Sequence, residues 1–81
     1  MIRVKLLFFA QCAEWMNAAH LEIEGAASQP LDDLLMGDPR FKAVLEHRSI
    51  LKVAINQKFS EFKTEVKDGD EVAFLPPFSG G

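Results

Sequence analysis

The sequence predicts an α+β domain in which a sheet packs its apolar face against one main helix. Several short segments alternate apolar and polar residues with a period of two, as strands with one buried face do. A stretch with helical spacing lies between the second and third of these segments. Turn residues such as Asp68-Gly69-Asp70 separate the segments. Paired strands around one helix are typical of this fold class.

The first two strands are predicted at Ile2–Phe9 and His20–Glu24, and Gly25 ends the second. They can form the arms of a hairpin with a long loop. Residues Ala10–Met16 between them favour a turn or a short helix. The apolar face of the first strand consists of Ile2, Val4, Leu6 and Phe8.

The main helix follows, with Ser28 and Pro30 as its start signals. The acidic pair Asp32-Asp33 falls in its first turn, where the helix dipole favours negative charge. Gly37-Asp38-Pro39 is expected to break the helix. The i, i+3, i+4 apolar pattern then resumes over Phe41–Arg48.

Three further strands are predicted after the helix. The first alternates over Leu51–Asn56 and leads through the turn Asn56-Gln57-Lys58 to a short strand around Phe59. The last strand, Glu71–Leu75, follows the Asp68-Gly69-Asp70 turn, in which Gly69 can take a positive φ. Pro76 and Pro77 end it, because proline has no N–H for the ladder.

Length and composition restrict the classes of function. The 81 residues, 48% of them hydrophobic, are expected to form a single domain over 1–81. With Cys12 as the sole cysteine, no intramolecular disulfide can form, and we expect a buried or half-buried thiol in a reducing, cytoplasmic setting. Arg3 and Lys5 interrupt the first apolar run, and no apolar stretch is long enough to cross a membrane. His20 and His47 lack ligand-like spacing, so no metal site is expected.

The net charge of −3 is unevenly distributed. Residues 1–58 carry seven basic and seven acidic side chains, whereas residues 59–81 carry two and five, so the whole excess lies in the last third. A nucleic-acid partner would need a basic patch, and none is expected. The acidic segment fits either a basic protein partner or an ordinary solvated surface.

The end of the chain reads Phe78-Ser79-Gly80-Gly81 after the two prolines. Consecutive prolines favour an extended segment, and glycines make it thin enough to enter a narrow channel. Residues 76–81 are therefore a candidate extended tail that delivers the Gly81 carboxylate to another protein. The alternative is a frayed terminus of ordinary composition.

Three stretches of the sequence resemble the small subunit of molybdopterin synthase, a family with the ubiquitin-like β-grasp fold. They are Val4–Gln11, Val53–Gln57 and Asp68–Gly81, which read VKLLFFAQ, VAINQ and DGDEVAFLPPFSGG. The sequence differs from the family pattern at Cys12-Ala13-Glu14-Trp15, in the interrupted helix, and at Phe78, where valine is usual.

The resemblance implies that Gly81 is the reacting residue of a sulfur carrier. An E1-like adenylating enzyme would activate the Gly81 carboxylate with ATP, and a sulfur donor would convert it to a thiocarboxylate. Phe78, Ser79 and Gly80 would enter the large synthase subunit, where the sulfur passes to cyclic pyranopterin monophosphate. The chain contains no P-loop motif for a nucleotide, so ATP would be used in trans and no cofactor would be bound.

The resemblance also implies a partner surface and an assembly. Phe9, Phe59 and Leu75 are expected on the open sheet face and would contact the large subunit, in a heterotetramer of two small and two large subunits. The chain would then be a co-substrate that is not catalytic alone. The alternatives are a carrier for thiamin thiazole or another product, a ubiquitin-like protein modifier, and an interaction module with an incidental Gly-Gly end.

Overall fold

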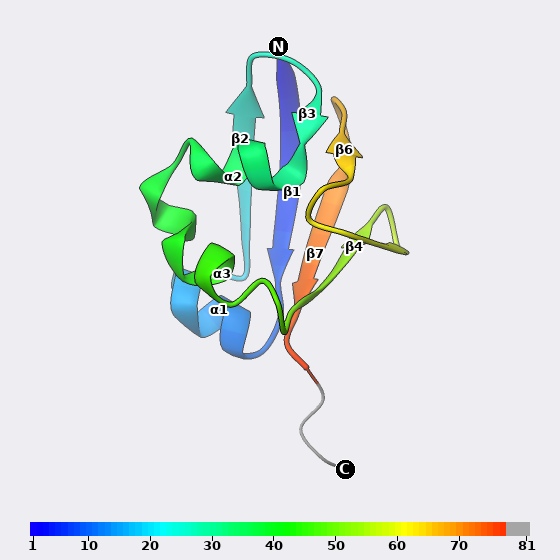
Figure 1. Ribbon diagram of the computed structural model, residues 1–81. Coiled ribbons are helices and arrows are strands. Elements are labelled where there is room, and N and C mark those ends of the chain that lie inside the picture. The colour runs from blue at the N-terminus through cyan, green and yellow to red at the C-terminus, as the bar shows by residue number, and fades with distance from the viewer. Residues whose placement is uncertain (78–81) are drawn as a thin grey trace.

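A computed structural model describes residues 1–77 of the chain (Figure 1). The order of its elements differs from the predicted one mainly by short additions. The elements are β1 (Ile2–Phe8), α1 (Gln11–Met16), β2 (His20–Gly25), β3 (Gln29–Pro30), α2 (Leu31–Met36), the 3₁₀ helix η1 (Pro39–Phe41), α3 (Lys42–Glu46), β4 (Lys52–Ile55), β5 (Lys58–Ser60), β6 (Glu65–Val66) and β7 (Glu71–Leu75).

The main sheet has five strands in the order β2-β1-β7-β4-β5. β1 and β7 are parallel, and the other neighbouring strands are antiparallel, so the sheet is mixed. β1 and β2 form the predicted hairpin, with Val4 opposite Ile23. β7, the last strand in sequence, lies in the centre of the sheet between β1 and β4.

The core lies between one face of this sheet and the helices, which cover that face alone (Figure 1). The alternation predicted for the first strand is confirmed, since its apolar face is buried throughout. Phe8 and Phe74 stack at 5.3 Å between ring centroids, which joins β1 to β7 inside the core. The buried side chains from the sheet are Ile2, Val4, Leu6, Phe8, Ile23, Val53, Ile55, Val72 and Phe74.

The helical layer is divided where the sequence predicts. α2 ends at Met36, and η1 and α3 follow the break at Gly37-Asp38-Pro39. The Asp38 side chain accepts a hydrogen bond from the backbone N–H of Arg40 at 2.9 Å and so caps η1. The Arg40 guanidinium also donates to Asp38 at 2.7 Å, and these hydrogen bonds lower the pKa of the Asp38 carboxyl.

Pro30, one of the two predicted start signals, is the residue directly before α2, and Asp32 and Asp33 lie in its first turn as predicted. Ser28, the other predicted start signal, does not cap the helix. It is exposed, and α2 begins at Leu31 without any side-chain cap. The first N–H groups of α2 are satisfied by a distant segment instead: Leu31 donates to the Thr64 carbonyl and Asp32 to the Phe62 carbonyl, each at 2.9 Å. A contact between distant parts of the chain therefore replaces the local cap.

The sequence also does not predict the small second sheet. β3 and β6 are two residues long each and pair antiparallel, with Gln29 opposite Val66 and Pro30 opposite Glu65. Two residues are too few to show a period. This pair fixes the segment before β7 to the segment before α2.

Candidate functional site

The point at which the chain leaves the sheet is held firmly. β7 pairs with β1 and β4 on its two sides, and its Phe74 carbonyl accepts a hydrogen bond from the Phe9 N–H at 3.2 Å. The Phe74 ring also lies 6.0 Å from that of Phe62. After Leu75 the two prolines cannot extend the ladder. The structure therefore provides a firmly held base, since the chain leaves the sheet at the end of its central strand (Figure 1).

Pro76 is half-buried and Pro77 is exposed, and they are the last residues that the structure describes. The predicted reacting residue Gly81 and the predicted insertion residues Phe78, Ser79 and Gly80 lie outside the described residues. The described part of the candidate site is the base of the tail and the sheet face beside it.

An apolar row crosses the sheet on the face away from the helices. Side chains directly opposite each other on neighbouring strands share a face. The registers place Leu7 of β1 opposite Ala73 of β7, Ala73 opposite Ala54 of β4, and Ala54 opposite Phe59 of β5. The two alanines make a low floor between the larger side chains of Leu7 and Phe59.

Leu75 and Phe9 extend this row toward the base of the tail. Leu75 lies two residues after Ala73 on the same face and opposite Lys52. Phe9 follows β1 directly, beside the end of β7. We call the set Leu7, Phe9, Ala54, Phe59, Ala73 and Leu75 the outer apolar surface.

The three residues predicted for a partner interface all belong to the outer apolar surface. Phe59 is 77% exposed and Phe9 is 47% exposed, whereas Leu75 is half-buried. The Phe9 N–H bonds to the carbonyl of Phe74, the residue before Leu75, whereas Phe59 lies on β5, two strands away from β7 and in the neighbouring row. Sequence reasoning missed Ala54, which connects them, because only the register shows that a small residue there leaves the row open.

Charged residues border the outer apolar surface. Lys5 lies opposite Glu22 on one side and Glu71 on the other, in the row next to Leu7 and Ala73. Lys52 borders it beside Leu75. A partner with an apolar centre and both signs of charge around it would complement this surface.

Two of the motifs that carry the resemblance meet at the other end of the sheet. The Asn56 side chain donates to the Asp70 carboxylate at 2.9 Å and accepts from the Glu71 N–H at 3.0 Å. Asp68 accepts from the Arg3 N–H at 2.9 Å, and Gly69 between the two aspartates has a φ of 88°. These polar residues hold strands together and lie far from the tail.

Cys12 and His47, the other candidate residues, pack against neighbouring residues of the fold. Cys12 is fully buried, and burial raises the pKa of its thiol, which opposes a nucleophilic thiolate. His47 is exposed and stacks on Trp15 with ring centroids 4.3 Å apart.

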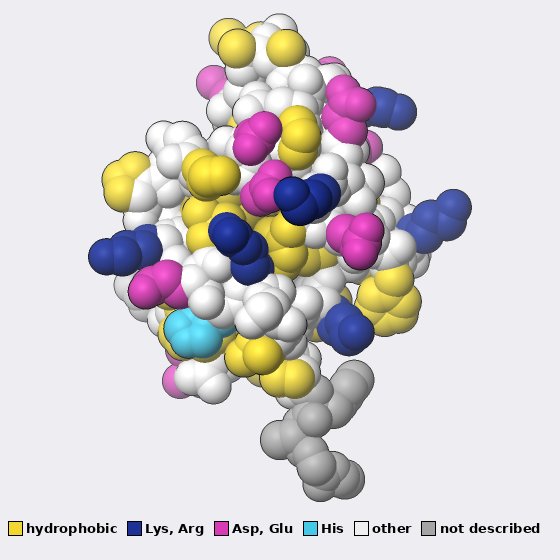
Figure 2. All heavy atoms as spheres, viewed as in Figure 1, with side chains coloured by type: hydrophobic (Ala, Val, Ile, Leu, Met, Phe, Trp, Pro, Cys, Tyr) yellow, Lys and Arg dark blue, Asp and Glu magenta, His cyan; other side chains and the backbone are white. Residues whose placement is uncertain are grey.

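Residues 1–77 contain no group of three or more potential metal ligands and no helix long and apolar enough to span a bilayer. On the helix-bearing face, acidic and basic side chains are interspersed (Figure 2).

The arrangement of the elements defines the structural class. A mixed sheet with its first and last long strands parallel in the centre and helices on one face is the ubiquitin-like β-grasp fold. Solved structures confirm it: the small archaeal modifier protein SAMP1 from Haloferax volcanii matches with a TM-score of 0.77 at 22% identity, over 98% of this chain and 99% of that one.

The sequence assigns the chain to a family within this class. The ThiS family model matches residues 6–81, and the chain belongs to the ThiS family. Proteins named molybdopterin synthase sulfur carrier subunit are 35% identical in Haemophilus influenzae and 37% identical in Escherichia coli. Each alignment covers 96% of this chain and 99% of the relative, which confirms the resemblance noted from the motifs.

One solved relative is a complex. The structure of subunits 1 and 2 of molybdopterin-converting factor from Helicobacter pylori contains a chain that matches with a TM-score of 0.63 at 25% identity, over 99% of this chain and 100% of that one. The thiamine biosynthesis protein ThiS from Geobacter metallireducens is 27% identical with a TM-score of 0.56, over 95% of this chain and 99% of that one.

Proposed function

We propose that this protein is a sulfur carrier in molybdopterin biosynthesis and that it carries the sulfur on the carboxyl carbon of Gly81. The observation that carries the proposal is the nearly full-length match to relatives named as sulfur carrier subunits of molybdopterin synthase. The sheet supports it, because its central strand leads directly to Pro76-Pro77 and the Gly-Gly end.

The chemistry requires activation before sulfur can enter. A carboxylate is a poor electrophile, so the Gly81 carboxylate first attacks the α-phosphate of ATP and pyrophosphate leaves. A sulfur nucleophile at the oxidation level of sulfide then attacks the acyl carbon, and the C–S bond forms as AMP leaves. The resulting thiocarboxylate delivers its sulfur to cyclic pyranopterin monophosphate, and water restores the carboxylate.

This division of the chemistry needs partners. The sequence has no nucleotide-binding P-loop, so an E1-like adenylating enzyme would use the ATP and a separate donor would supply the sulfur. The large synthase subunit would receive the tail residues Phe78, Ser79 and Gly80. We propose a heterotetramer with two copies of each subunit, located in the cytoplasm.

The outer apolar surface is the proposed docking site for the large subunit. It combines exposed Phe9 and Phe59 with half-buried Leu75, and Leu75 is the last residue of the strand that leads to the tail. A partner bound there would hold the base of the tail beside its own active site. Exposed apolar groups bordered by charge mark such contacts in other proteins.

A protein modifier is the second candidate function. The likeness to small archaeal modifier proteins favours it, with a TM-score of 0.72 at 25% identity for that of Methanosarcina acetivorans. Both functions begin with the same adenylate on Gly81. They differ in the nucleophile that follows, which is sulfur in a carrier and a lysine amine in a modifier.

Intact-mass spectrometry tests the proposal. After incubation with ATP, the cognate adenylating enzyme and a sulfur donor, the chain should exchange one oxygen for one sulfur, and fragmentation should place the sulfur on Gly81. Cys12→Ser is the control, because a persulfide on Cys12 would add sulfur without removing oxygen. The Cys12→Ser chain should acquire the sulfur on Gly81 as the parent chain does. Sulfur found only on Cys12, or isopeptide conjugates without any thiocarboxylate, would contradict the carrier.

A further inference from the structure

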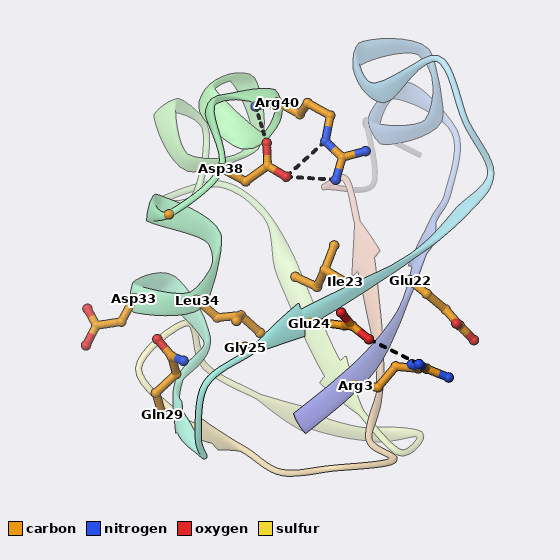
Figure 3. A pocket seen from close by; sticks show the side chains of 11 residues that line it. Arg3, Glu22, Ile23, Glu24, Gly25, Gln29, Asp33, Leu34, Asp38 and Arg40 are labelled. Carbon is orange, nitrogen blue, oxygen red and sulfur yellow. Dashed lines mark hydrogen bonds and ion pairs between the residues drawn. The ribbon is translucent and has the colours of Figure 1, made fainter. Parts of the chain in front are cut away.

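An open groove runs along the free edge of β2. It has a volume of about 700 Å³ and lies between β2 on one side and α2, the break after it and η1 on the other (Figure 3). Ile23 and Leu34 form the apolar part of its lining. The outer apolar surface contributes no residue to it.

The backbone of β2 has hydrogen-bonding groups along its free edge, and the groove lies beside those of Glu22 and Glu24. Among residues 1–77, β2 is an edge strand whose sole pairing partner is β1. The Phe8 N–H donates to the Ala19 carbonyl, and in an antiparallel ladder every second pair exchanges hydrogen bonds. In this register Leu21 and Ile23 are bonded to β1, so the N–H and C=O groups of His20, Glu22 and Glu24 point away from β1.

The groove carries excess negative charge. Four acidic and two basic residues are among those that line it: Glu22, Glu24, Asp33, Asp38, Arg3 and Arg40. Arg3 pairs with Glu24 at 3.1 Å and Arg40 with Asp38 at 2.7 Å. Within residues 1–77, Glu22 and Asp33 have no ion-pair partner. Both carboxylates point away from the groove (Figure 3), and Glu22 lies at the free edge of β2 on the sheet face that also carries Arg3 and Lys5.

The same charges oppose pairing between two copies of this chain. An antiparallel β2–β2 contact would bring Glu22 and Glu24 of one copy against those of the other. Like charges directly opposite in a ladder are destabilising, and acidic side chains are a common protection of sheet edges. A second copy is therefore a poor occupant for the groove.

We propose that this groove binds an extended, basic segment of a different protein by strand addition to β2. The backbone of the segment would bond to the free groups of His20, Glu22 and Glu24. Its Lys or Arg side chains would face Glu22 and Glu24, and the alternate side chains, small and apolar, would lie over Ile23 and Leu34.

The position of the groove allows this contact together with the others. Glu24 and Gly25 lie opposite Arg3 and Ile2 at the start of β1, whereas the chain leaves the sheet beside Phe8 at its end. A segment in the groove thus leaves the outer apolar surface and the base of the tail uncovered. A partner bound in the groove could therefore remain bound while the tail enters a second protein.

Amide NMR spectra of the full chain test the inference with a defined probe. The probe is an acetylated, amidated peptide of alternating valine and lysine, and the control is the same peptide with every backbone amide N-methylated, which removes the donors along both edges. The probe should shift the amide signals of His20, Glu22 and Glu24 and slow their hydrogen exchange, and its binding should weaken with added salt. The N-methylated peptide should not bind at this edge.

Two variants separate the backbone contribution from the charge. Glu22→Pro removes an N–H that β1 does not use, so the fold should persist, as prolines are tolerated on edge strands. Its affinity for the probe should fall about tenfold below that of Glu22→Gln, which removes only the charge.

Equal affinity of Glu22→Pro and Glu22→Gln, equal binding of the N-methylated control, or shifts confined to other strands would overturn the proposal. So would a concentration-dependent dimer of the free chain that pairs through β2. None of these results tests the formation of a thiocarboxylate on Gly81, so the proposed function is tested separately.

Discussion

Asn56 performs two tasks at one position. Its φ of 53°, with 68° at Gln57, forms the two-residue turn between β4 and β5, which is the left-handed geometry of a type I′ hairpin. Its side chain also bonds to Asp70 and to the Glu71 N–H, and its own N–H donates to the Glu71 carbonyl at 2.7 Å. The turn and the start of β7 are therefore fixed by the same residue.

Replacing Asn56 should separate these tasks. Asn56→Gly keeps the positive φ but loses two side-chain hydrogen bonds, so the free energy of unfolding should fall by about 1–2 kcal/mol. Asn56→Ala should cost more, since alanine is also strained at this φ. Urea unfolding of the three proteins measures both steps. An Asn56→Gly chain as stable as the parent would show that the side chain contributes nothing.

The positive φ of Gln57 costs free energy, and among the described residues its side chain makes no hydrogen bond that offsets this cost. Gln57→Gly should raise the free energy of unfolding by about 0.5–1 kcal/mol, because glycine takes a positive φ without strain and Asn-Gly is the preferred pair for this turn. Gln57→Ala serves as the control and should be close to neutral. Thermal melts of both variants check the prediction, which a melting temperature at or below the parent's for Gln57→Gly would contradict.

At the scale of elements, the long strands could be predicted from the sequence because each buries one face. The alternation in Ile2–Phe8 and the turn at Asp68-Gly69-Asp70 are local signals, and the structure confirms both. The placement of Asp32 and Asp33 in the first turn of α2 is confirmed. The hydrogen bonds of its first N–H groups and the β3–β6 pair could not be predicted. Both depend on carbonyl groups near Thr64 that come close only in the folded chain.

The candidate site divides in the same way. The outward position of Phe9 followed from strand periodicity, because residues on the face away from the helix must meet solvent or a partner. The placement of Phe59 followed from its short neighbouring strand and from the family resemblance, and its exposure is confirmed. The role of Ala54 could not be predicted in this way, because only the registers of β7, β4 and β5 show that it connects the larger apolar side chains. No local pattern contains the free edge of β2 either, since it depends on which strand pairs with β1.

The outer apolar surface should be essential for binding the large synthase subunit. Phe9→Glu should weaken that binding by more than about 1 kcal/mol, the range expected for an interface anchor, while the isolated chain keeps most of its stability. Ile50→Glu is a matched control: Ile50 is 51% exposed against 47% for Phe9, and it lies outside this surface. Isothermal titration with the large subunit compares the two. Equal losses for both variants would argue against a specific surface.

At the scale of the whole molecule, folding should depend on β7, and function should depend on Gly81 at the end of the tail that follows it. Deleting Gly81 should abolish formation of the thiocarboxylate and leave the melting temperature unchanged, because the strand ladder ends at Leu75. Phe74→Ala should instead cost about 3–5 kcal/mol, the usual cost of truncating a buried aromatic ring. Thermal melts and mass spectrometry on both variants compare the effects. Sulfur transfer by the chain without Gly81 would refute the carrier mechanism.

The parallel pairing of β1 with β7 has a consequence for biosynthesis. A ribosome makes β1 first and β7 last, yet the two lie side by side in the middle of the sheet. A nascent chain that has not yet released β7 has a gap at the centre of its sheet and lacks Val72 and Phe74 from its core. Such a chain cannot close its fold, since the pairing that completes the sheet joins the most distant strands. Prematurely terminated products would therefore remain unfolded and open to proteolysis, and would not compete with intact carriers for the same partners.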